Sequence, residues 1–317
     1  MPKIAYIEKK FQAKTMAVID NATAIIAEYS AQGFTLTVRQ LYYQMVARAM
    51  IPNTAAEYKR IVKILTDARL AGLIDWYAIE DRTRTLRGNS HWTSPQDIVT
   101  TAKKSYLIDK WKDQDYRLEV WIEKDALVGV IASICHDLDV NYFSCRGYTS
   151  ISAIWKAAIR LRNHALDDDH KQDPVVIHLA DHDPSGIDMT RDARDRLDLL
   201  TMMAGTVQVE RIALNHDQVE QYSPPPNFTK MTDSRAPDYV HRFGYDSWEL
   251  DALEPQVIVD LIESAILEYR DEERWADKVE EEELHKEIIQ IGLDAMPDPD
   301  DYEQESDDTD EDEYEWE

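Results

Sequence analysis

Two aspartates one residue apart carry the clearest chemical signal in the chain. Asp181 and Asp183 follow the largely apolar run 175–180 in the segment PVVIHLADHDPS. Such a run is typical of a strand buried on both faces of a parallel sheet, and open α/β sheets bind ligands beyond the carboxyl ends of their strands. Two carboxylates this close repel each other, and a hard divalent cation with oxygen ligands relieves that repulsion. The pair therefore predicts a metal site; the simpler alternative is that Asp183 or Ser185 caps the helix that follows.

A third carboxylate, Glu123, follows another predicted strand in the segment LEVWIEKDAL. Predicted strands alternate with predicted helices in this part of the chain: strands over 118–122, 141–145, 174–180 and 207–214, and helices over 126–138, 151–165 and 189–203. This alternation predicts an α/β fold with one small parallel sheet. Because the carboxyl ends of parallel strands lie at one edge, Glu123 is expected to meet the aspartate pair there. Three carboxylates from two strands predict a metal site more strongly than two from one.

The first 105 residues predict a separate module that binds DNA. Amphipathic helices are expected over 8–32, 37–49 and 54–70, followed by a strand over 73–80 and a basic loop over 81–87. The second and third helices open with capping-box pairs, Thr37 with Gln40 and Thr54 with Glu57. Three helices followed by a β-ribbon predict a winged helix-turn-helix; the alternative is a three-helix bundle whose charged helix is simply solvated. The predicted DNA contacts are Lys59, Arg60 and Lys63 on the third helix and Arg82 and Arg84 in the loop.

The second of these helices carries two adjacent tyrosines. Tyr42 shares a face with the apolar residues of the helix and is predicted to lie in the core. Tyr43 falls on a more polar face, four residues from Arg39. It is therefore predicted to point outward beside a guanidinium group.

The charge of the chain is unevenly distributed. The net charge of −27, taken alone, argues against nucleic-acid binding. Residues 1–105, however, carry 15 Lys and Arg against nine Asp and Glu, a net +6, while the remainder carries 20 against 53, a net −33. A basic module joined to an acidic remainder is compatible with DNA binding by the module alone.

Neither a membrane nor a secretory pathway is indicated. No apolar run approaches the length of a membrane span, and the segment MPKIAYIEKKFQ lacks the apolar core of a signal peptide. Cys135 and Cys145 have no metal-ligand spacing and are expected to be buried thiols. A cytoplasmic, DNA-associated protein is expected.

Four regions are expected in all: a winged-helix domain over 1–105, a metal-binding domain over 106–253, a helical segment over 254–293 and a tail over 294–317. A linker is predicted over 94–115 and an irregular stretch over 215–247. The helical segment carries an apolar stripe that suits a packing face. The tail holds fourteen Asp and Glu with no Lys or Arg, so it is predicted to be disordered.

The motifs also resemble a known family. TVRQLYYQMV is similar to the winged-helix tyrosine motif of the type IIB topoisomerase A subunit and the related meiotic double-strand-break transesterase. VWIEKDAL, SCRGYTSIS and LADHDPSGIDM resemble, in the same order and spacing, the three signatures of that family's Toprim domain. The resemblance covers about residues 35–215. The chain is shorter than the usual A subunit, which suggests one of the miniature relatives found in mobile elements. WELDAL resembles a later family segment only loosely, and no chemistry is assigned to it.

The resemblance implies a site and a reaction. Tyr43 would be the nucleophile and Arg39 its phosphate partner. The implied Mg²⁺ ligands are Glu123, Asp181 and Asp183. The activity would be DNA cleavage through a covalent 5′-phosphotyrosyl intermediate, carried out by a homodimer on double-stranded DNA. The chain contains no ATPase module, so a partner ATPase subunit is left open, and the acidic tail departs from the family pattern.

Two other functions are kept as alternatives. One is a Toprim nuclease that hydrolyses nucleic acid with metal and water and uses the winged helix only for binding. The other is a DNA-binding or assembly protein without catalysis. A covalent protein–DNA adduct would be formed by the transesterase alone.

Overall fold

The computed structural model describes residues 3–79, 89–202 and 205–297. The chain divides into two compact units. The first comprises Met1–Thr85 and Asp115–Arg270, and the second comprises Leu86–Gln114 and Asp271–Glu317. The candidate site lies in the first unit.

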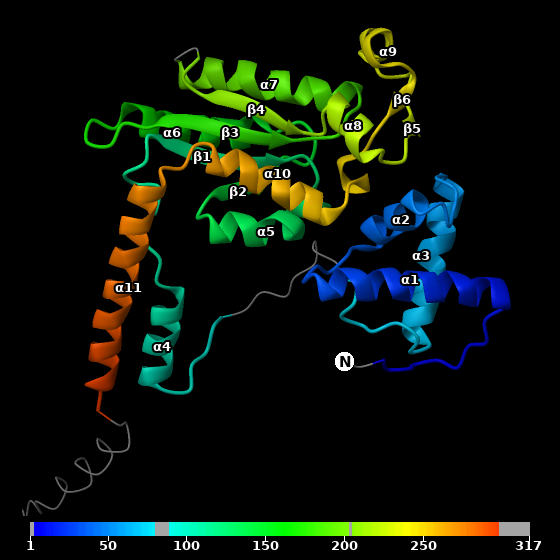
Figure 1. Cartoon of the computed structure of the whole chain (residues 1–317), viewed down its shortest axis with the longest axis horizontal. Coiled ribbons are helices and arrows are strands. Elements are labelled where there is room, and N and C mark those ends of the chain that lie inside the picture. The colour runs from blue at the N-terminus through cyan, green and yellow to red at the C-terminus, as the bar shows by residue number, and fades with distance from the viewer. Residues whose placement is uncertain (1–2, 80–88, 203–204, 298–317) are drawn as a thin grey trace, which may run out of the picture. The chain divides into compact units, whose positions relative to one another are not determined.

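A four-stranded parallel sheet is the centre of the first unit (Figure 1). Its strands are β1 (Tyr116–Ile122), β2 (Asn141–Ser144), β3 (Asp173–Leu179) and β4 (Gln208–Ala213), in the order β2-β1-β3-β4. Each neighbouring pair is parallel, so the carboxyl ends of all four strands point the same way. The expected α/β class with a small parallel sheet is confirmed.

Helices cover both faces of this sheet. On one face lie α6 (Ile151–Leu166) and α7 (Pro184–Thr201), and on the other lie α5 (Val128–Asp137) and α10 (Pro255–Leu267), with the short 3-10 helix η1 (Asp125–Leu127) before α5 (Figure 1). The core under α6 and α7 is formed by apolar side chains of both helices and of β1 and β3. The apolar stripe of α10 packs inside the unit, against α5 and β4. Both cysteines are free thiols, Cys135 buried and Cys145 partly buried.

The N-terminal residues form three helices around a core of their own: α1 (Ala13–Ala31), α2 (Val38–Ala47) and α3 (Ala55–Leu70). The capping box at the start of α2 is present in full, whereas at α3 only half of it forms. There the Thr54 hydroxyl accepts from the backbone of Glu57, but the Glu57 carboxylate binds Arg60 instead of returning to Thr54.

The expected strand over 73–80 is wrong for its described part. Residues 73–79 form turns, apart from an isolated bridge between Leu36 and Ile79. They are held against α3 by hydrogen bonds such as that from the Leu73 backbone to Ala68, and Ile74 and Ile79 lie in the core of the three helices. The apolar and aromatic residues of this segment predicted a strand, but no second strand pairs with it among the described residues. The basic loop over 81–87, with Arg82 and Arg84, lies outside the described residues.

The stretch over 215–247 is more ordered than expected. It contains α8 (His216–Tyr222), α9 (Ala236–Phe243) and a short antiparallel pair, β5 (Asn227–Phe228) with β6 (Asp246–Ser247). The 3-10 helix η2 (Leu250–Ala252) follows. These elements are too short to show a hydrophobic period, and contacts elsewhere hold them in place. The backbone of Trp248, for example, exchanges two hydrogen bonds with His182.

In the second unit, the expected linker contains a helix, α4 (Pro95–Ser105). Ser94 caps it and Pro95 occupies its first turn, a local start signal that outweighs the polar composition. The helix packs on α11 (Glu272–Asp294). The expected C-terminal helical segment therefore consists of two helices, α10 in the first unit and α11 in the second. The acidic tail from residue 298 onward lies outside the described residues. None of the helices in the described part of the chain is both long and apolar enough to cross a bilayer.

Candidate functional site

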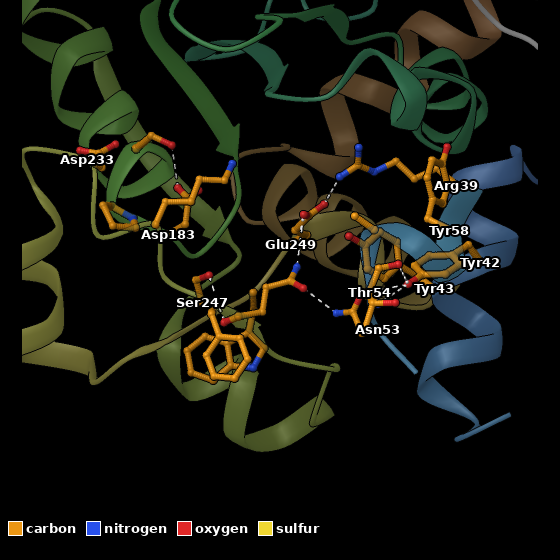
Figure 2. A pocket seen from close by; sticks show the side chains of 17 residues that line it. Arg39, Tyr42, Tyr43, Asn53, Thr54, Tyr58, Asp183, Asp233, Ser247 and Glu249 are labelled. Carbon is orange, nitrogen blue, oxygen red and sulfur yellow. Dashed lines mark hydrogen bonds and ion pairs between the residues drawn. The ribbon is translucent and has the colours of Figure 1, made fainter. Parts of the chain in front are cut away.

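A cavity of about 440 Å³ lies in the first unit and is lined by residues from distant parts of the sequence (Figure 2). Side chains from α2 and from the start of α3 contribute to the wall, as do the first turn of α7 and residues on and beside β5 and β6. Arg39, Tyr43 and Asp183, which the sequence predicted to act together, all line this cavity. The cavity therefore brings the predicted nucleophile to the carboxyl edge of the sheet.

Tyr43 is buried, in contrast to the sequence prediction. Its exposed fraction is 5%, close to the 3% of Tyr42. The helical period placed Tyr43 on the more polar face of α2, but η2 packs against this helix and Tyr43 is buried, while Arg39 on the same face stays partly exposed. The expected neighbour is present, since the guanidinium carbon of Arg39 lies 5.7 Å from the centroid of the Tyr43 ring.

The surroundings of Tyr43 favour its neutral form. Burial raises the pKa of the phenol well above its ordinary value, and the nearby carboxylates of Glu249 and Asp251 raise it further. Arg39 and a hydrogen bond with the side chain of Asn227 act in the opposite direction. The Asn227 side chain is held in turn, because its oxygen accepts from Asn53 at 2.5 Å and its nitrogen donates to Glu249 at 3.2 Å.

Tyr42 has a structural role. Its hydroxyl accepts from the backbone nitrogen of Thr54 at 2.9 Å and donates to the carbonyl oxygen of Thr54 at 3.1 Å. These bonds hold the start of α3 against α2. The predicted core position of Tyr42 is confirmed, whereas the predicted outward position of Tyr43 is wrong, since both are buried in the same core.

Arg39 is held by two carboxylates, that of Glu249 just before η2 and that of Asp251 within η2. Its Nε lies 2.8 Å from Asp251 Oδ2, and its NH2 group forms an ion pair with Glu249. Burial by itself lowers the pKa of Arg39, but Asp251 and Glu249 outweigh it, so the guanidinium stays charged. These two acids occur in the WELDAL segment, to which the sequence assigned no chemistry.

Lys124, the residue after Glu123, is surrounded by carboxylates. Its Nζ lies 2.9 Å from Asp181 Oδ1, 2.8 Å from Glu249 Oε2 and 2.8 Å from Asp251 Oδ1. Burial lowers the pKa of Lys124, but the three anions raise it far more. Lys124 and Arg39 in turn hold the pKa of Glu249 at about 2 despite burial, so this carboxylate is ionised. One network of charges thus joins α2 to the edge of the sheet.

The three predicted metal ligands lie at this edge, and each has a partner within the protein. The backbone nitrogen of Asp181 donates to Glu123 Oε2 at 2.9 Å. Asp183 caps α7, accepting from the Gly186 backbone at 2.6 Å and from the Ser185 hydroxyl at 2.8 Å. The capping role that the sequence offered as the simpler alternative is therefore present.

Whether these residues suit a cation can be judged from their charges. Burial raises the pKa of Glu123, and the negative charge of Asp183 raises it further. Burial also raises the pKa of Asp181, while Lys124 opposes this. Mutual repulsion of buried oxygen donors is the situation that Mg²⁺ relieves, so the chemistry of the donor set fits it. Across the described residues, however, no three His, Cys, Asp or Glu side chains are grouped in a way that could hold an ion.

A buried arginine that the sequence did not single out fixes the backbone of this edge. Arg211, on β4, donates to the carbonyl oxygens of Ala180 at 3.0 Å, Asp181 at 2.7 Å and Gly186 at 2.9 Å. Gly186 packs so closely here that a Cβ atom on it would lie 2.1 Å from the Asp181 carbonyl oxygen. The strand-to-helix turn with both aspartates is therefore tightly defined.

The predicted DNA contacts are not part of the cavity wall. Lys59, Arg60 and Lys63 are exposed on α3, and Arg60 forms an ion pair with Glu57. Their contact with DNA stays a prediction. Sequence reasoning missed Asn227, because a single asparagine in a proline-rich loop has no periodic or motif signal.

No family model matches the chain, and no curated protein matches it.

Proposed function

We propose that the protein is a Mg²⁺-dependent DNA-cleaving transesterase, similar in mechanism to the type IIB topoisomerase A subunit. In this proposal α1–α3 act as a winged-helix module and the parallel sheet with its helices acts as a Toprim domain. The observation that supports it best is the shared cavity, because Tyr43 and Arg39 on α2 and Asp183 at the start of α7 are far apart in the sequence and line the same cavity. Phosphodiester transfer needs a nucleophile and positive charge to stabilise the transition state. Here the tyrosine supplies the nucleophile, the guanidinium supplies positive charge, and the carboxylates at the sheet edge could bind a cation.

In the proposed reaction the Tyr43 oxygen attacks a DNA phosphorus atom. A bond forms between that oxygen and phosphorus, and the bond from phosphorus to the 3′ oxygen breaks. The phenol loses its proton and the 3′ oxygen gains one, so the step is balanced without an oxidant or a co-reactant. The product is a 5′-phosphotyrosyl ester whose energy is close to that of the bond broken.

The side chains around Tyr43 have distinct tasks in this reaction. Arg39 binds the phosphate and stabilises the negative charge that develops on it. Mg²⁺ held by Glu123, Asp181 and Asp183 would stabilise the same charge and the leaving 3′ oxygen. The Asn227 amide orients the phenol and favours its ionised form. Lys59 and its neighbours on α3 would bind the DNA backbone, which positions the duplex without reading its sequence.

The proposed functional form is a homodimer on double-stranded DNA. Cutting both strands of a duplex calls for two sites related by a two-fold axis. Two alternatives differ in chemistry: hydrolysis by metal and water, or DNA binding without cleavage.

The decisive experiment traps the intermediate. Labelled duplex DNA is incubated with protein and Mg²⁺, the reaction is stopped with detergent, and protein-linked label is measured. We expect an adduct on the 5′ end with the parent protein and none with Tyr43→Phe. Tyr42→Phe removes the neighbouring hydroxyl and keeps the adduct, although it costs about 1 kcal/mol of stability for its lost hydrogen bonds. Cleavage without an adduct would establish the nuclease, and binding without cleavage the third alternative.

A further inference from the structure

We propose that Glu249 is an internal competitor for the DNA phosphate: it occupies the NH2 edge of Arg39 that the phosphate takes, while Asp251 holds Arg39 in place for either partner. This inference rests on the proposed function, in which Arg39 binds the phosphate, and it concerns how access to that arginine is regulated.

The two acids that hold Arg39 differ in their surroundings. The Asp251 side chain is completely buried, and it pairs with the inner Nε of Arg39 and with Lys124. The Glu249 side chain is 25% exposed, lines the cavity and pairs with the outer NH2 group of Arg39. Because Arg39 itself is 44% exposed, a ligand in the cavity can reach the bond with Glu249 but not the bond with Asp251.

Glu249 can leave Arg39 without becoming an unpaired charge. Lys124 lies 2.8 Å from its Oε2, and the Asn227 amide donates to its other oxygen at 3.2 Å. Both partners stay available to Glu249 when a phosphate replaces it on Arg39. A guanidinium binds carboxylate and phosphate oxygens alike, so a phosphate oxygen can take the NH2 position that Glu249 Oε2 occupies.

The charge of the cavity explains why a competitor matters. Its charged lining residues are two cations, Arg39 and Lys230, and three anions, Asp183, Asp233 and Glu249. The lining residues therefore carry a net charge of −1, and one of the three anions is paired with the arginine that the phosphate needs. Neutralising Glu249 balances the lining charges and frees the NH2 group of Arg39.

A purely structural role for Glu249 predicts the opposite outcome. If the ion pair only docked α2 against η2, its loss would loosen Arg39 and weaken DNA binding. The competitor model instead predicts tighter binding, because Asp251 still orients the guanidinium.

The test measures binding without chemistry. In a Tyr43→Phe background, the affinity for a short labelled duplex is determined at low salt by fluorescence anisotropy. We expect Glu249→Gln to tighten binding by between about threefold and about fivefold, the upper part of the range for one partly exposed charged pair. The matched control is Glu263→Gln, the same substitution at an exposed position on α10 outside the cavity, and it should leave the affinity within about twofold.

Further variants distinguish the competitor from other effects. Adding Arg39→Gln should abolish the increase in DNA affinity that Glu249→Gln gives. Asp251→Asn should lower the DNA affinity, because Arg39 loses the ion pair that orients its guanidinium group. If Glu249→Gln does not melt cooperatively, Glu249→Asp replaces it, since the shorter acid reaches Arg39 less well and should also tighten binding.

Two results would overturn the inference: a folded Glu249 variant that binds no more tightly than Glu263→Gln, or a gain that persists without Arg39. The transesterase proposal fails separately, in the adduct assay with Tyr43 intact. If no adduct forms but Glu249→Gln tightens DNA binding only when Arg39 is present, Glu249 is a competitor for the phosphate and the transesterase proposal is wrong.

Discussion

Replacing Gly186 by alanine tests the tight turn that carries both aspartates. Gly186 lies in the first turn of α7, where the Asp183 carboxylate accepts its backbone hydrogen bond. An added Cβ would lie 2.1 Å from the Asp181 carbonyl oxygen and 2.9 Å from its carbonyl carbon. Nonbonded heavy atoms prefer about 3.5–4.0 Å, and both atoms belong to the backbone, so the turn itself must move.

Two opposing effects set the size of the change. In an open helix, alanine in place of glycine stabilises by about 1 kcal/mol. Overpacking against a fixed neighbour costs about 1–3 kcal/mol, and displacement of the Asp181 carbonyl also disturbs its bond with Arg211. We therefore expect Gly186→Ala to lower the free energy of unfolding by roughly 2 kcal/mol, given the typical range for such substitutions.

The chain offers a matched control for this substitution. Gly292 lies near the end of α11, and a Cβ there would meet nothing within 4 Å. Gly292→Ala should therefore keep or raise stability by up to about 1 kcal/mol. Urea unfolding followed by circular dichroism measures both variants. If Gly186→Ala is as stable as the parent, the close approach of the Asp181 carbonyl is not real, and the argument for a fixed carboxylate edge fails with it.

Three further predictions concern the metal, the assembly and the pH dependence. Glu123→Gln should lose the rise in melting temperature that Mg²⁺ gives the parent protein; an equal rise in the variant would remove Glu123 from the metal site. Because Tyr43 and Asp183 line one cavity of a single chain, a mixture of Tyr43→Phe and Glu123→Gln proteins, each inactive alone, should not nick DNA even when subunits exchange. Nicks would instead mean that each site of the homodimer combines residues of both chains. In the second unit, hydrogen bonds from Lys110 and Lys286 hold the pKa of Glu282 at about 2 despite its burial, against an ordinary value of 4.5. The resulting stability is present above about pH 4.5 and is lost as the pH falls towards 2, so Glu282→Gln should reduce the acid-induced drop in melting temperature. An identical drop in parent and variant would contradict this assignment.

Much of the framework could be predicted from the sequence because its causes are local. The helix starts at Thr37 and Thr54 depend on side chains within one turn, and both were correct. The alternation of strands and helices predicted the parallel sheet and, with it, the common edge for Glu123 and the two aspartates. Helical periodicity also separated Tyr42 from Tyr43.

The surroundings of the site could not be predicted in this way, because they depend on segments far apart in the chain. Periodicity says which face of α2 is polar, but it does not say that η2 covers that face and buries Tyr43. Glu249 and Asp251 gave no signal beyond a loose motif, since an acid becomes a partner of Arg39 only when the chain folds back onto α2. The helix in the expected linker shows the same limit, because α4 needs α11 as its packing partner. The sequence by itself thus determined the strands of the parallel sheet, most of its helices and the common edge of the three carboxylates. Tertiary structure alone decided which charges surround the nucleophile, because burial and ion pairing are set by whatever packs against a side chain.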